Sequence, residues 1–370
     1  MIKSNSSQSG GILTLLGRQV CVTVVISVAA TLLTLVLRLI GVSSVLVFLV
    51  SGIALAALAS MVGHGTDQLG CRLGAGATGV LQSALGNLPE LFISIFALRA
   101  GLLLVVQTAL VGSILANSLL VLGLAFTAGG LKNGVQTFGT TQTRMISILL
   151  LLSVAALSIP AIATAPGAPD SGHPEGLSVI VAVVLLLVFA ASIPFSMRGG
   201  PGASEEELGF ARPWPLWLAM LILIAAGTAS AFVSDWFVDA LRPSMVTLGI
   251  SESFVGMVIV AIAGNAVENV VGVQMAIRNN ADLAVSLILN SSLQVALALI
   301  PALVIISRLI GGTHLTLVLS PLLIASLGLA AILGALIVYD GESTWLEGLA
   351  LMGLYVIIAA SFWWGPAVKP

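Results

Sequence analysis

Long apolar runs dominate this chain and limit the folds open to it. We count eleven runs of membrane-spanning length, at about residues 20–38, 42–63, 76–98, 102–128, 145–164, 177–196, 214–238, 250–277, 282–308, 314–339 and 344–364. A helix needs about 20 apolar residues to cross the hydrocarbon layer. Because backbone groups in lipid must bond within the protein, the spans are helices or a closed barrel. Unbroken rather than alternating apolar runs exclude the barrel, so we predict an all-α polytopic membrane protein with about eleven transmembrane helices.

Composition favours a membrane protein over a soluble one. Only 8% of the 370 residues are charged and 58% are hydrophobic, whereas a soluble domain carries about 25% charged residues. The basic residues are scattered singly, which excludes a nucleic-acid surface. Cys21 and Cys71 belong to no metal or redox motif. The apolar run after Arg18 is long enough to span, which predicts a first membrane helix rather than a cleaved signal peptide.

A sequence repeat divides the chain into two similar halves. The stretch GNLPE at 86–90 returns as GNAVE at 264–268, and SILANSLLVLGLA at 113–125 returns as SLILNSSLQVALA at 286–298. These matches predict one extra helix followed by two units of five helices. Because five is odd, the second unit begins on the opposite side of the membrane. The two units are therefore inverted, an arrangement found in many secondary transporters.

The polar stretch MRGGPGASEEELGFARP separates the two units. We predict an N-terminal segment with the first helix (1–41), a first repeat (42–196), an acidic cytosolic linker (197–213) and a second repeat (214–370). More of the 13 Lys and Arg residues fall on the inner side when the N-terminus is cytoplasmic, as the positive-inside rule favours. The expected location is the inner membrane of a prokaryotic cell.

Each repeat carries one glutamate near the middle of a predicted span. A charged side chain at the centre of a span is unfavourable by about 2.5–3.5 kcal/mol on insertion scales. No Lys or Arg lies in the central region of the spans that hold Glu90 and Glu268. Each carboxylate must therefore take a proton or share an imported cation. The alternative for a single buried glutamate is a neutral, hydrogen-bonded packing role.

Oxygen-bearing residues accompany the two glutamates. Asn87 and Asn265 stand three positions before them, a spacing that shares one helix face. Gly86, Gly264 and Pro89 weaken regular helix and free backbone carbonyls. Hard cations such as Ca²⁺ take about six to eight oxygen ligands. No Cys or His stands among these residues, which argues against zinc, copper and iron. The predicted metal ligands are Glu90, Glu268, Asn87, Asn265, Gly86, Gly264, Gln82, Asn117, Asn290 and Gln294.

Charge balance predicts how such a site would work. Two carboxylates neutralise one divalent ion or two protons, so the site can exchange one Ca²⁺ for two H⁺ without carrying net charge through lipid. Glu90 and Glu268 are thus the predicted proton-coupling residues. For Asn117, Asn290 and Gln294 the alternative role is to hold helices together. Ser113 and Ser286 are expected to pack helices rather than to bind ions.

At these residues the chain resembles the Ca²⁺/H⁺ antiporters of the calcium/cation antiporter superfamily. GNAVE at 264–268, RNNADLAVSLILNSSLQVALALIPALV at 278–304 and VGSILANSLLVLGLAFTAGG at 111–130 fit that family's repeat pattern. The resemblance covers about residues 42–365. It implies eleven helices with a lone first helix, an acidic cytosolic segment before helix seven, and essential acids at the two motif glutamates. It implies an alternating-access antiporter that exports Ca²⁺ or a similar divalent cation for H⁺, with these ions and the bilayer as partners and no cofactor.

Several residues depart from the pattern of these antiporters. GNLPE replaces Gly-Asn-Ala-x-Glu and is similar to the Na⁺/Ca²⁺ exchanger branch. Gln82 stands where Asn is frequent, Asn269 replaces a frequent His, and AIAGN at 261–265 lacks a common proline. These departures concern ion preference more than fold. A Na⁺-driven Ca²⁺ exchanger is therefore the alternative function.

An intramembrane lipid-processing enzyme is the alternative from another class. SRLIGGTH at 307–314 has the Ser-Arg-x₅-His spacing of membrane lipid phosphatases. However, Val318 stands where that motif requires Asp, and the order of the motifs along the chain is wrong. The chain also has no His-Glu-x-x-His, nucleotide loop or Gly-x-Ser-x-Gly elbow. We therefore predict a transporter without catalytic residues.

Overall fold

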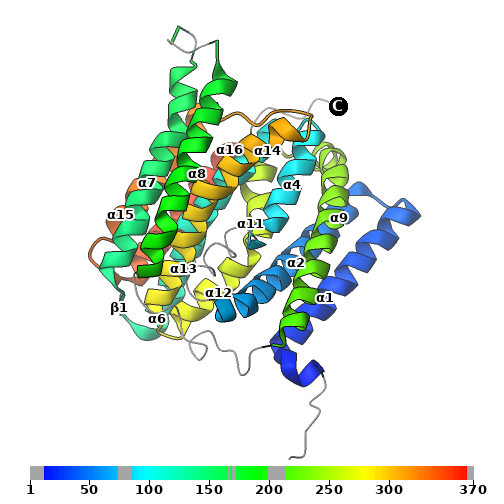
Figure 1. The fold of residues 1–370 in the computed structure, drawn as a ribbon, viewed down its shortest axis with the longest axis horizontal. Coiled ribbons are helices and arrows are strands. Elements are labelled where there is room, and N and C mark those ends of the chain that lie inside the picture. Colours follow the sequence, from blue (N-terminus) through cyan, green and yellow to red (C-terminus); the bar gives the residue numbers. More distant parts are fainter. Residues whose placement is uncertain (1–11, 74–84, 166, 169–171, 199–213, 365–370) are drawn as a thin grey trace, which may run out of the picture.

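The structure, a computed structural model, describes residues 12–73, 85–165, 167–168, 172–198 and 214–364. Helices make up nearly all of this part of the chain (Figure 1). The first half contains α1 (Ile12–Ile40), α2 (Ser44–Leu73), α4 (Leu88–Arg99), α5 (Leu103–Leu115), the π-helical turn η1 (Ala116–Val121), α6 (Leu122–Asn133), β1 (Gln136–Thr137), α7 (Thr140–Ala163) and α8 (Pro174–Arg198).

The second half has a similar order of helices. It contains α9 (Leu216–Leu248), α10 (Glu252–Phe254), the π-helical turn η2 (Val255–Val260), α11 (Ala261–Gly264), α12 (Ala266–Ile277), α13 (Ala281–Gln294), the π-helical turn η3 (Val295–Leu299), α14 (Ile300–Leu309), α15 (Pro321–Ile337), β2 (Glu342–Ser343) and α16 (Trp345–Trp363). Each half thus places a broken helix before a long helix that is interrupted by a π-helical turn.

Eight helices in the described part of the chain are long and apolar enough to cross a membrane, and the bent pair Glu252–Gly264 and Asn269–Ile277 makes a ninth. The apolar helix α15 is shorter, at 17 residues. Helix α4 is the described part of the span predicted at 76–98, whose first half lies outside the described residues. The predicted all-α polytopic class is confirmed, and the described helices are consistent with eleven spans.

A small sheet supports the inverted relation of the two units. Strand β1 follows the third span of the first unit, and β2 follows the fourth span of the second unit. The strands pair antiparallel, with Gln136 opposite Ser343 and Thr137 opposite Glu342. In two units of the same orientation these connections would lie on opposite sides of the membrane. Their pairing therefore requires that one unit is inverted relative to the other.

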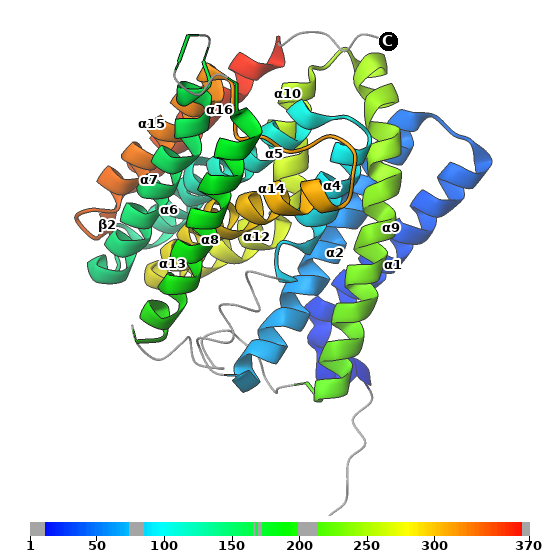
Figure 2. The same cartoon turned by 45° about the horizontal axis from the view of Figure 1, so that its top comes forward.

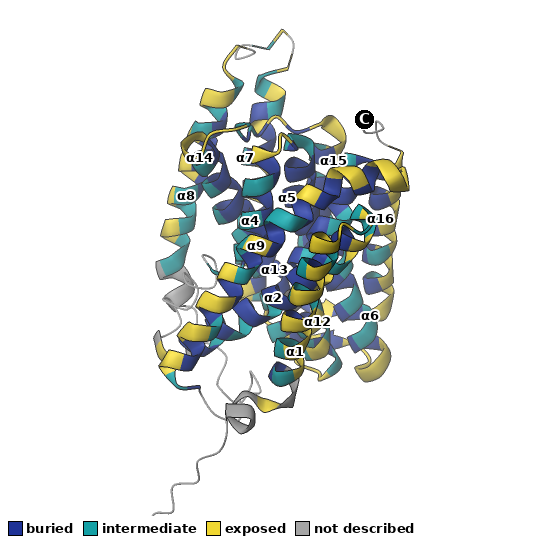
Figure 3. Cartoon of the chain, turned by 90° about the vertical axis from the view of Figure 1, so that its right-hand side faces the viewer, coloured by how far each residue is buried: buried dark blue, intermediate teal, exposed yellow. Residues whose placement is uncertain are grey.

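The helices form a central group with flanking groups on either side. Figure 2 shows α4, α5 and α12 in the middle, α1, α2 and α9 on one side, and α7, α8 and α15 on the other. Within the described residues, the most apolar part of the span Leu103–Asn133 is 89% buried, whereas that of Val20–Ile40 is 22% buried. Figure 3 shows the same gradient, with buried residues inside and exposed residues on the outer helices. The centre of the fold is therefore α5, η1 and α6.

Glycines let the central helices approach closely. A Cβ added at Gly112 of α5 would lie 2.4 Å from the carbonyl oxygen of Met257, and one at Gly256 would lie 2.5 Å from the carbonyl oxygen of Val105. The backbones of α5 and η2 therefore touch at this crossing. Small residues at such crossings are typical of membrane helix pairs, because lipid supplies no hydrophobic force between helices.

The span predicted at 314–339 begins later than expected. Residues 310–320 (the strap) are not helical, and α15 starts at Pro321. Gly311 and Gly312 have positive φ values of 70° and 95°, which breaks the preceding helix. Ser320 caps α15 by accepting from the N–H of Leu323 at 3.4 Å. A proline in the first turn suits a helix start because its missing N–H has no partner there anyway.

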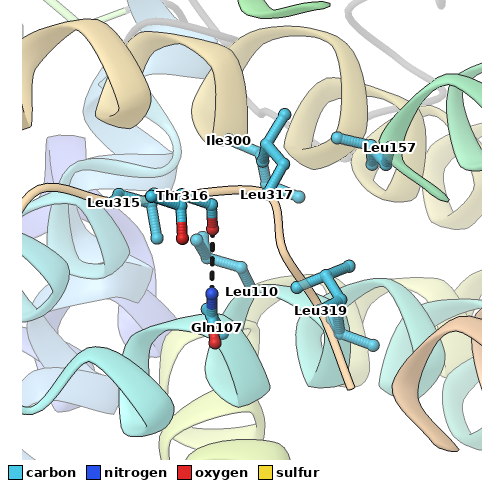
Figure 4. A pocket seen from close by; sticks show the side chains of 9 residues that line it. Gln107, Leu110, Leu157, Ile300, Leu315, Thr316, Leu317 and Leu319 are labelled. Carbon is cyan, nitrogen blue, oxygen red and sulfur yellow. Dashed lines mark hydrogen bonds between the residues drawn. The ribbon is translucent and has the colours of Figure 1, made fainter. Parts of the chain in front are cut away.

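The strap satisfies its backbone through side chains of other spans. Gln107 Nε2 donates to the carbonyls of Thr316 (2.8 Å) and Val318 (3.3 Å), the N–H of Leu315 donates to Ser307 Oγ (3.0 Å), and the N–H of Leu317 donates to Ser178 Oγ (3.0 Å). Figure 4 shows Gln107 pointing at the strap from α5. The apolar void beside it is about 10 Å³, at the limit of what one water needs. Non-helical backbone at membrane depth is tolerated when protein surrounds it in this way.

Candidate functional site

The first motif lies at a helix start in the middle of the protein. Gly86 and Asn87 form a turn, α4 begins at Leu88, and Glu90 is the third residue of α4. Asn87 and Glu90 are 3% and 6% exposed. Pro89 occupies the first turn, where its missing N–H is tolerated. The first turn of a helix also stabilises a negative charge through the helix dipole, so α4 favours an acid at this position.

The second motif has the same local geometry. α11 ends at Gly264, α12 begins at Ala266, and Asn265 between them is fully buried. Its φ and ψ of −91° and 24° nearly equal the −95° and 22° of Asn87. α4 and α12 each contain 12 residues. Glu268 is therefore the third residue of its helix, as Glu90 is, and its side chain lies outside the described side chains.

The breaks change one detail of the expected arrangement. Asn87 and Asn265 precede their helices instead of sharing a regular helix face with the glutamates. Their carbonyls accept the N–H groups of Leu91 and Asn269, each at 3.0 Å. These two carbonyls therefore serve the helix starts. Gly86 and Gly264 as backbone ligands stay predictions.

The two motifs meet at Glu90. A Cβ added at Gly264 would lie 2.7 Å from the Cγ, Cδ and Oε1 atoms of Glu90. The glutamate of the first repeat thus lies directly against the backbone of the second motif, at the break between α11 and α12. Contacts between α11 and both α4 and α5 place these helices side by side. The inverted repeats therefore bring one carboxylate to the start of the opposite half-helix.

A buried amide and hydroxyl network crosses between the repeats beside this contact. Asn117 Nδ2 donates to Asn265 Oδ1 at 3.0 Å and to Ser291 Oγ at 2.9 Å. Asn265 Nδ2 donates to Ser113 Oγ at 2.6 Å and to the carbonyl of Ala261 at 2.8 Å. Asn117 and Asn265 are both 0% exposed. The second asparagine of the first repeat is thereby fixed to the motif of the second.

One oxygen in this network has no described hydrogen-bond partner. Asn117 Oδ1 is buried, and no donor among the described residues reaches it. A buried amide oxygen without a partner is costly. The same oxygen suits a hard cation, which binds amide carbonyls and carboxylates. Asn117 lies in η1, and π-helical turns of this kind occur often at functional sites.

Two other predicted ligands, Asn290 and Gln294, make no described hydrogen bond to this network. Asn290 Nδ2 donates to Ser286 Oγ of its own helix at 3.3 Å, and Gln294 is the last residue of α13. The described hydrogen bonds join neither residue to a motif. Gln82 lies outside the described residues. These three ligands stay predictions, as do the exact roles of Asn87 and Glu268.

The residues related to this network by the inverted repeat make different hydrogen bonds. The sequence repeat relates Ser113 to Ser286 and Asn117 to Asn290. By the symmetry of the inverted repeats, Ser286 and Asn290 would bond to Asn87, as Ser113 and Asn117 bond to Asn265. Among the described side chains Ser286 instead accepts from Gln142 Nε2 at 3.3 Å as well as from Asn290. The hydrogen bonds of Asn117 and Ser113 with Asn265 are therefore formed. Their counterparts Ser286 and Asn290 make other hydrogen bonds.

Ser291 was not singled out from the sequence as a site residue. It accepts from Asn117, while its neighbour Ser292 contacts Ser118 with 3.0 Å between the hydroxyl oxygens. The sequence contained a signal for these contacts, because both repeats have an Asn-Ser pair at the same position. Ser113, which we expected only to pack helices, also contacts the second motif.

The chemistry of the site is that of oxygen ligands with few acids. The described residues contain no group of three or more His, Cys, Asp or Glu side chains that could hold a metal. The described polar groups beside Gly264, against which Glu90 lies, are the amides of Asn265 and Asn117 and the hydroxyl of Ser113. Such a set offers hard oxygen ligands and one or two titratable carboxylates, which suits reversible binding of a hard cation or of protons.

Comparison with known proteins places the chain in a family. The sequence pattern of the sodium/calcium exchanger protein family matches residues 43–198 and 218–364. The Ca²⁺/H⁺ antiporter of Synechocystis sp. is 33% identical, covering 87% of this chain and 92% of its own length. The Ca²⁺/H⁺ antiporter ChaA of Bacillus subtilis is 35% identical, covering 86% and 92%. These relatives are transporters rather than enzymes.

Solved structures share the fold. The structure of native YfkE aligns with a TM-score of 0.80 at 32% identity, over 92% of this chain and 99% of that chain. The H⁺/Ca²⁺ exchanger CAX aligns with a TM-score of 0.73 at 17% identity, over 92% and 91%. The resemblance seen in the sequence motifs is thereby confirmed. The chain is a multi-pass membrane transporter and belongs to the sodium/calcium exchanger family, among whose members the Ca²⁺/H⁺ antiporters are its relatives.

Proposed function

We propose that this protein is a secondary antiporter that exchanges Ca²⁺, or a similar divalent cation, for H⁺. The contact of Glu90 with Gly264 of the opposite motif carries this proposal, because it brings an acid of one repeat to the ion motif of the other. Similarity to Ca²⁺/H⁺ antiporters over most of the chain supports the choice of ions. No resident cofactor is required, since Ca²⁺ and H⁺ are the substrates.

Glu90 and Glu268 are the proposed points of competition. When Ca²⁺ is bound, both carboxylates are ionised and share it. When Ca²⁺ leaves, each takes a proton, because an ionised carboxylate without a cation is unfavourable in the membrane interior. An empty, doubly charged site is thus the state of highest free energy. That penalty couples the movement of one Ca²⁺ to about two H⁺ in the opposite direction.

Amide oxygens complete the proposed cation site. Asn117 Oδ1 is buried beside Asn265 and has no described donor, so its lone pairs can accept a cation. Asn87 occupies the equivalent helix break in the first repeat. Five further residues remain proposed ligands, for states in which the symmetry-related hydrogen bonds of the other repeat have formed: Gly86, Gly264, Gln82, Asn290 and Gln294.

The two repeats are the proposed moving parts. The similar breaks at Asn87 and Asn265, in units of opposite orientation, favour alternating access around a site between them. We assign the first unit to residues 42–196, the acidic linker to 197–213 and the second unit to 214–370. The proposed location is the inner membrane of a prokaryotic cell, with the N-terminus and the linker in the cytoplasm.

Flux measurements in proteoliposomes separate this function from Na⁺-driven exchange. Purified protein is reconstituted, and ⁴⁵Ca²⁺ uptake is followed under an imposed pH gradient without Na⁺, then under a Na⁺ gradient at equal pH. We expect uptake with the pH gradient alone. Uptake only with the Na⁺ gradient would mean that Na⁺, and not H⁺, is the ion exchanged for Ca²⁺. Glu90→Gln and Glu268→Gln are each expected to abolish uptake while the protein still inserts, and normal uptake by either variant would favour a packing role.

A further inference from the structure

A polar cleft lies far from the ion site, on the flanking group formed by α1, α2 and α9. It encloses about 220 Å³, well above the roughly 30 Å³ that one water occupies in the liquid. Helix α1 packs mainly on α2 and barely touches α9. The cleft is lined by Arg38, Val42, Ser44, Val47, Trp236, Asp239 and Ala240.

Two opposite charges sit side by side in this cleft. The Arg38 guanidinium donates to Asp239 Oδ2 at 2.8 Å, and its Cζ lies 6.0 Å from the centre of the Trp236 ring. The side chains of Arg38 and Asp239 are 40% and 57% exposed. Each therefore has hydrogen-bonding capacity left over. The floor is apolar, since Val47 and Ala240 are 6% exposed.

The residues around the cleft are of the kinds expected at the level of lipid headgroups. Arg38 is in the last turn of α1, next to the turn at Gly41. α9 has 33 residues, whereas about 20 suffice to cross the hydrocarbon layer. Its last third, which carries Asp239 and the exposed Arg242, extends beyond what the hydrocarbon requires. Trp236 fits this level, because Trp is enriched where acyl chains meet headgroups.

We propose that the cleft binds the headgroup of a zwitterionic, amine-bearing phospholipid, as in phosphatidylethanolamine. The lipid phosphate lies on Arg38, and its primary ammonium lies on Asp239. An anionic headgroup without an amine would be attracted by Arg38 and repelled by Asp239. A choline headgroup carries the same charges, but its quaternary ammonium has no N–H to donate to Asp239. The acyl chains follow the apolar side of α2 and α9.

The experiment compares lipids that differ only in N–H donors. The full-length protein is purified in mild detergent and exposed to equal amounts of phosphatidylethanolamine, its N,N-dimethyl form, phosphatidylcholine and phosphatidylglycerol with identical acyl chains. Native mass spectrometry counts the retained lipid. We expect retention to fall as methyl groups replace N–H donors, by about threefold to fivefold over the series, the range of one partly exposed charged contact. Phosphatidylglycerol is expected below phosphatidylethanolamine.

Two variants and a control test the assignment of the charges. Asp239→Asn keeps the shape of the side chain and an oxygen for Arg38 but removes the negative charge, so it is expected to weaken the preference for N–H donors. Arg38→Ala is expected to lower retention of phosphatidylethanolamine, its N,N-dimethyl form and phosphatidylcholine, because the phosphate of each loses its partner. Arg308→Ala removes a different exposed ion pair, with Glu175 at 3.1 Å, and is expected to leave the series unchanged. Equal retention across the series by the natural protein, preferred retention of phosphatidylglycerol, or an unchanged series in Asp239→Asn would overturn the proposal.

Discussion

Asn117 Nδ2 donates to Asn265 Oδ1 across 3.0 Å, and this hydrogen bond joins the interrupted helix of the first repeat to the ion motif of the second. Both side chains are completely buried. Asn265 is held further by Ser113 from the first repeat, at 2.6 Å. The motif that carries Glu268 is therefore positioned by residues of the opposite repeat.

Replacing Asn117 tests this link. Asn117→Ala removes the donors to Asn265 and Ser291 and is expected to lower the free energy of unfolding by about 1–2 kcal/mol. Ca²⁺ uptake is expected to fall more strongly than this loss of stability explains, because the motif loses its position. For thermal stability the matched control is Asn290→Ala, since the described hydrogen bond of Asn290 stays within its own helix. Equal thermal stability of the two variants would contradict the special role of Asn117.

Gly264→Ala tests the contact between the motifs. The new methyl group would lie 2.7 Å from Glu90, so the carboxylate must move away from the second motif. An overpacking cost of about 1–3 kcal/mol at the site predicts a loss of Ca²⁺ uptake of at least about fivefold. The control is Gly328→Ala in α15, where nothing lies within 4 Å of the added Cβ. Uptake that is as high in Gly264→Ala as in the control would mean that Glu90 does not act at this place.

Competition between protons and Ca²⁺ predicts a pH dependence with a definite sign. Protons stabilise the Ca²⁺-free form, so lowering the pH must weaken Ca²⁺ binding. If two protons compete with one Ca²⁺, the apparent Kd rises by about 100-fold for each unit of pH lowered below the pKa values of both acids, and by about tenfold if only one competes. Measuring the Kd across pH for the natural protein and for Glu90→Gln gives the two slopes. The same slope in both proteins would exclude Glu90 from the competition.

The strap gives a prediction about stability rather than transport. Gln107→Ala leaves the carbonyls of Thr316 and Val318 without their side-chain donor, and a buried unpaired polar group costs about 1–3 kcal/mol. We expect a lower temperature of thermal unfolding with Ca²⁺ affinity unchanged. Gln142→Ala serves as the control, because Gln142 makes an exposed hydrogen bond of 3.3 Å. A large change in Ca²⁺ affinity would show that the strap reaches the ion site.

Local sequence signals predicted the parts of the site that depend on local chemistry. The Gly-Asn pairs at 86–87 and 264–265 predicted helix breaks, and the structure has nearly identical backbone angles there. The repeat of odd length predicted inversion, which the pairing of β1 with β2 supports. The helix breaks depend on local residue types and the inversion on a repeat along the chain, so both could be predicted from this sequence alone.

Other features depend on contacts between distant residues. The pairing of Asn117 with Asn265 spans 148 positions, and nothing near either residue specifies it. The strap was missed because LTLVL at 315–319 reads as part of an apolar span, although its alternating burial is that of an extended chain. Its backbone partners, such as Gln107 and Ser178, come from remote spans. Asn290 has the same sequence setting as Asn117 but a different contact, because the hydrogen bonds of the two repeats are not symmetric.

Counting the protons released when Ca²⁺ binds tests the central claim most directly. Purified protein in weakly buffered, Na⁺-free solution is titrated with Ca²⁺ while the pH is recorded, starting where both acids are protonated. Because the ligands must lose their protons to bind a metal, we expect about two H⁺ released per Ca²⁺ by the natural protein. Glu90→Gln and Glu268→Gln should each release about one H⁺ for any Ca²⁺ that still binds. Tight Ca²⁺ binding without proton release, or unchanged release in both variants, would contradict the competition of the two ions at these glutamates.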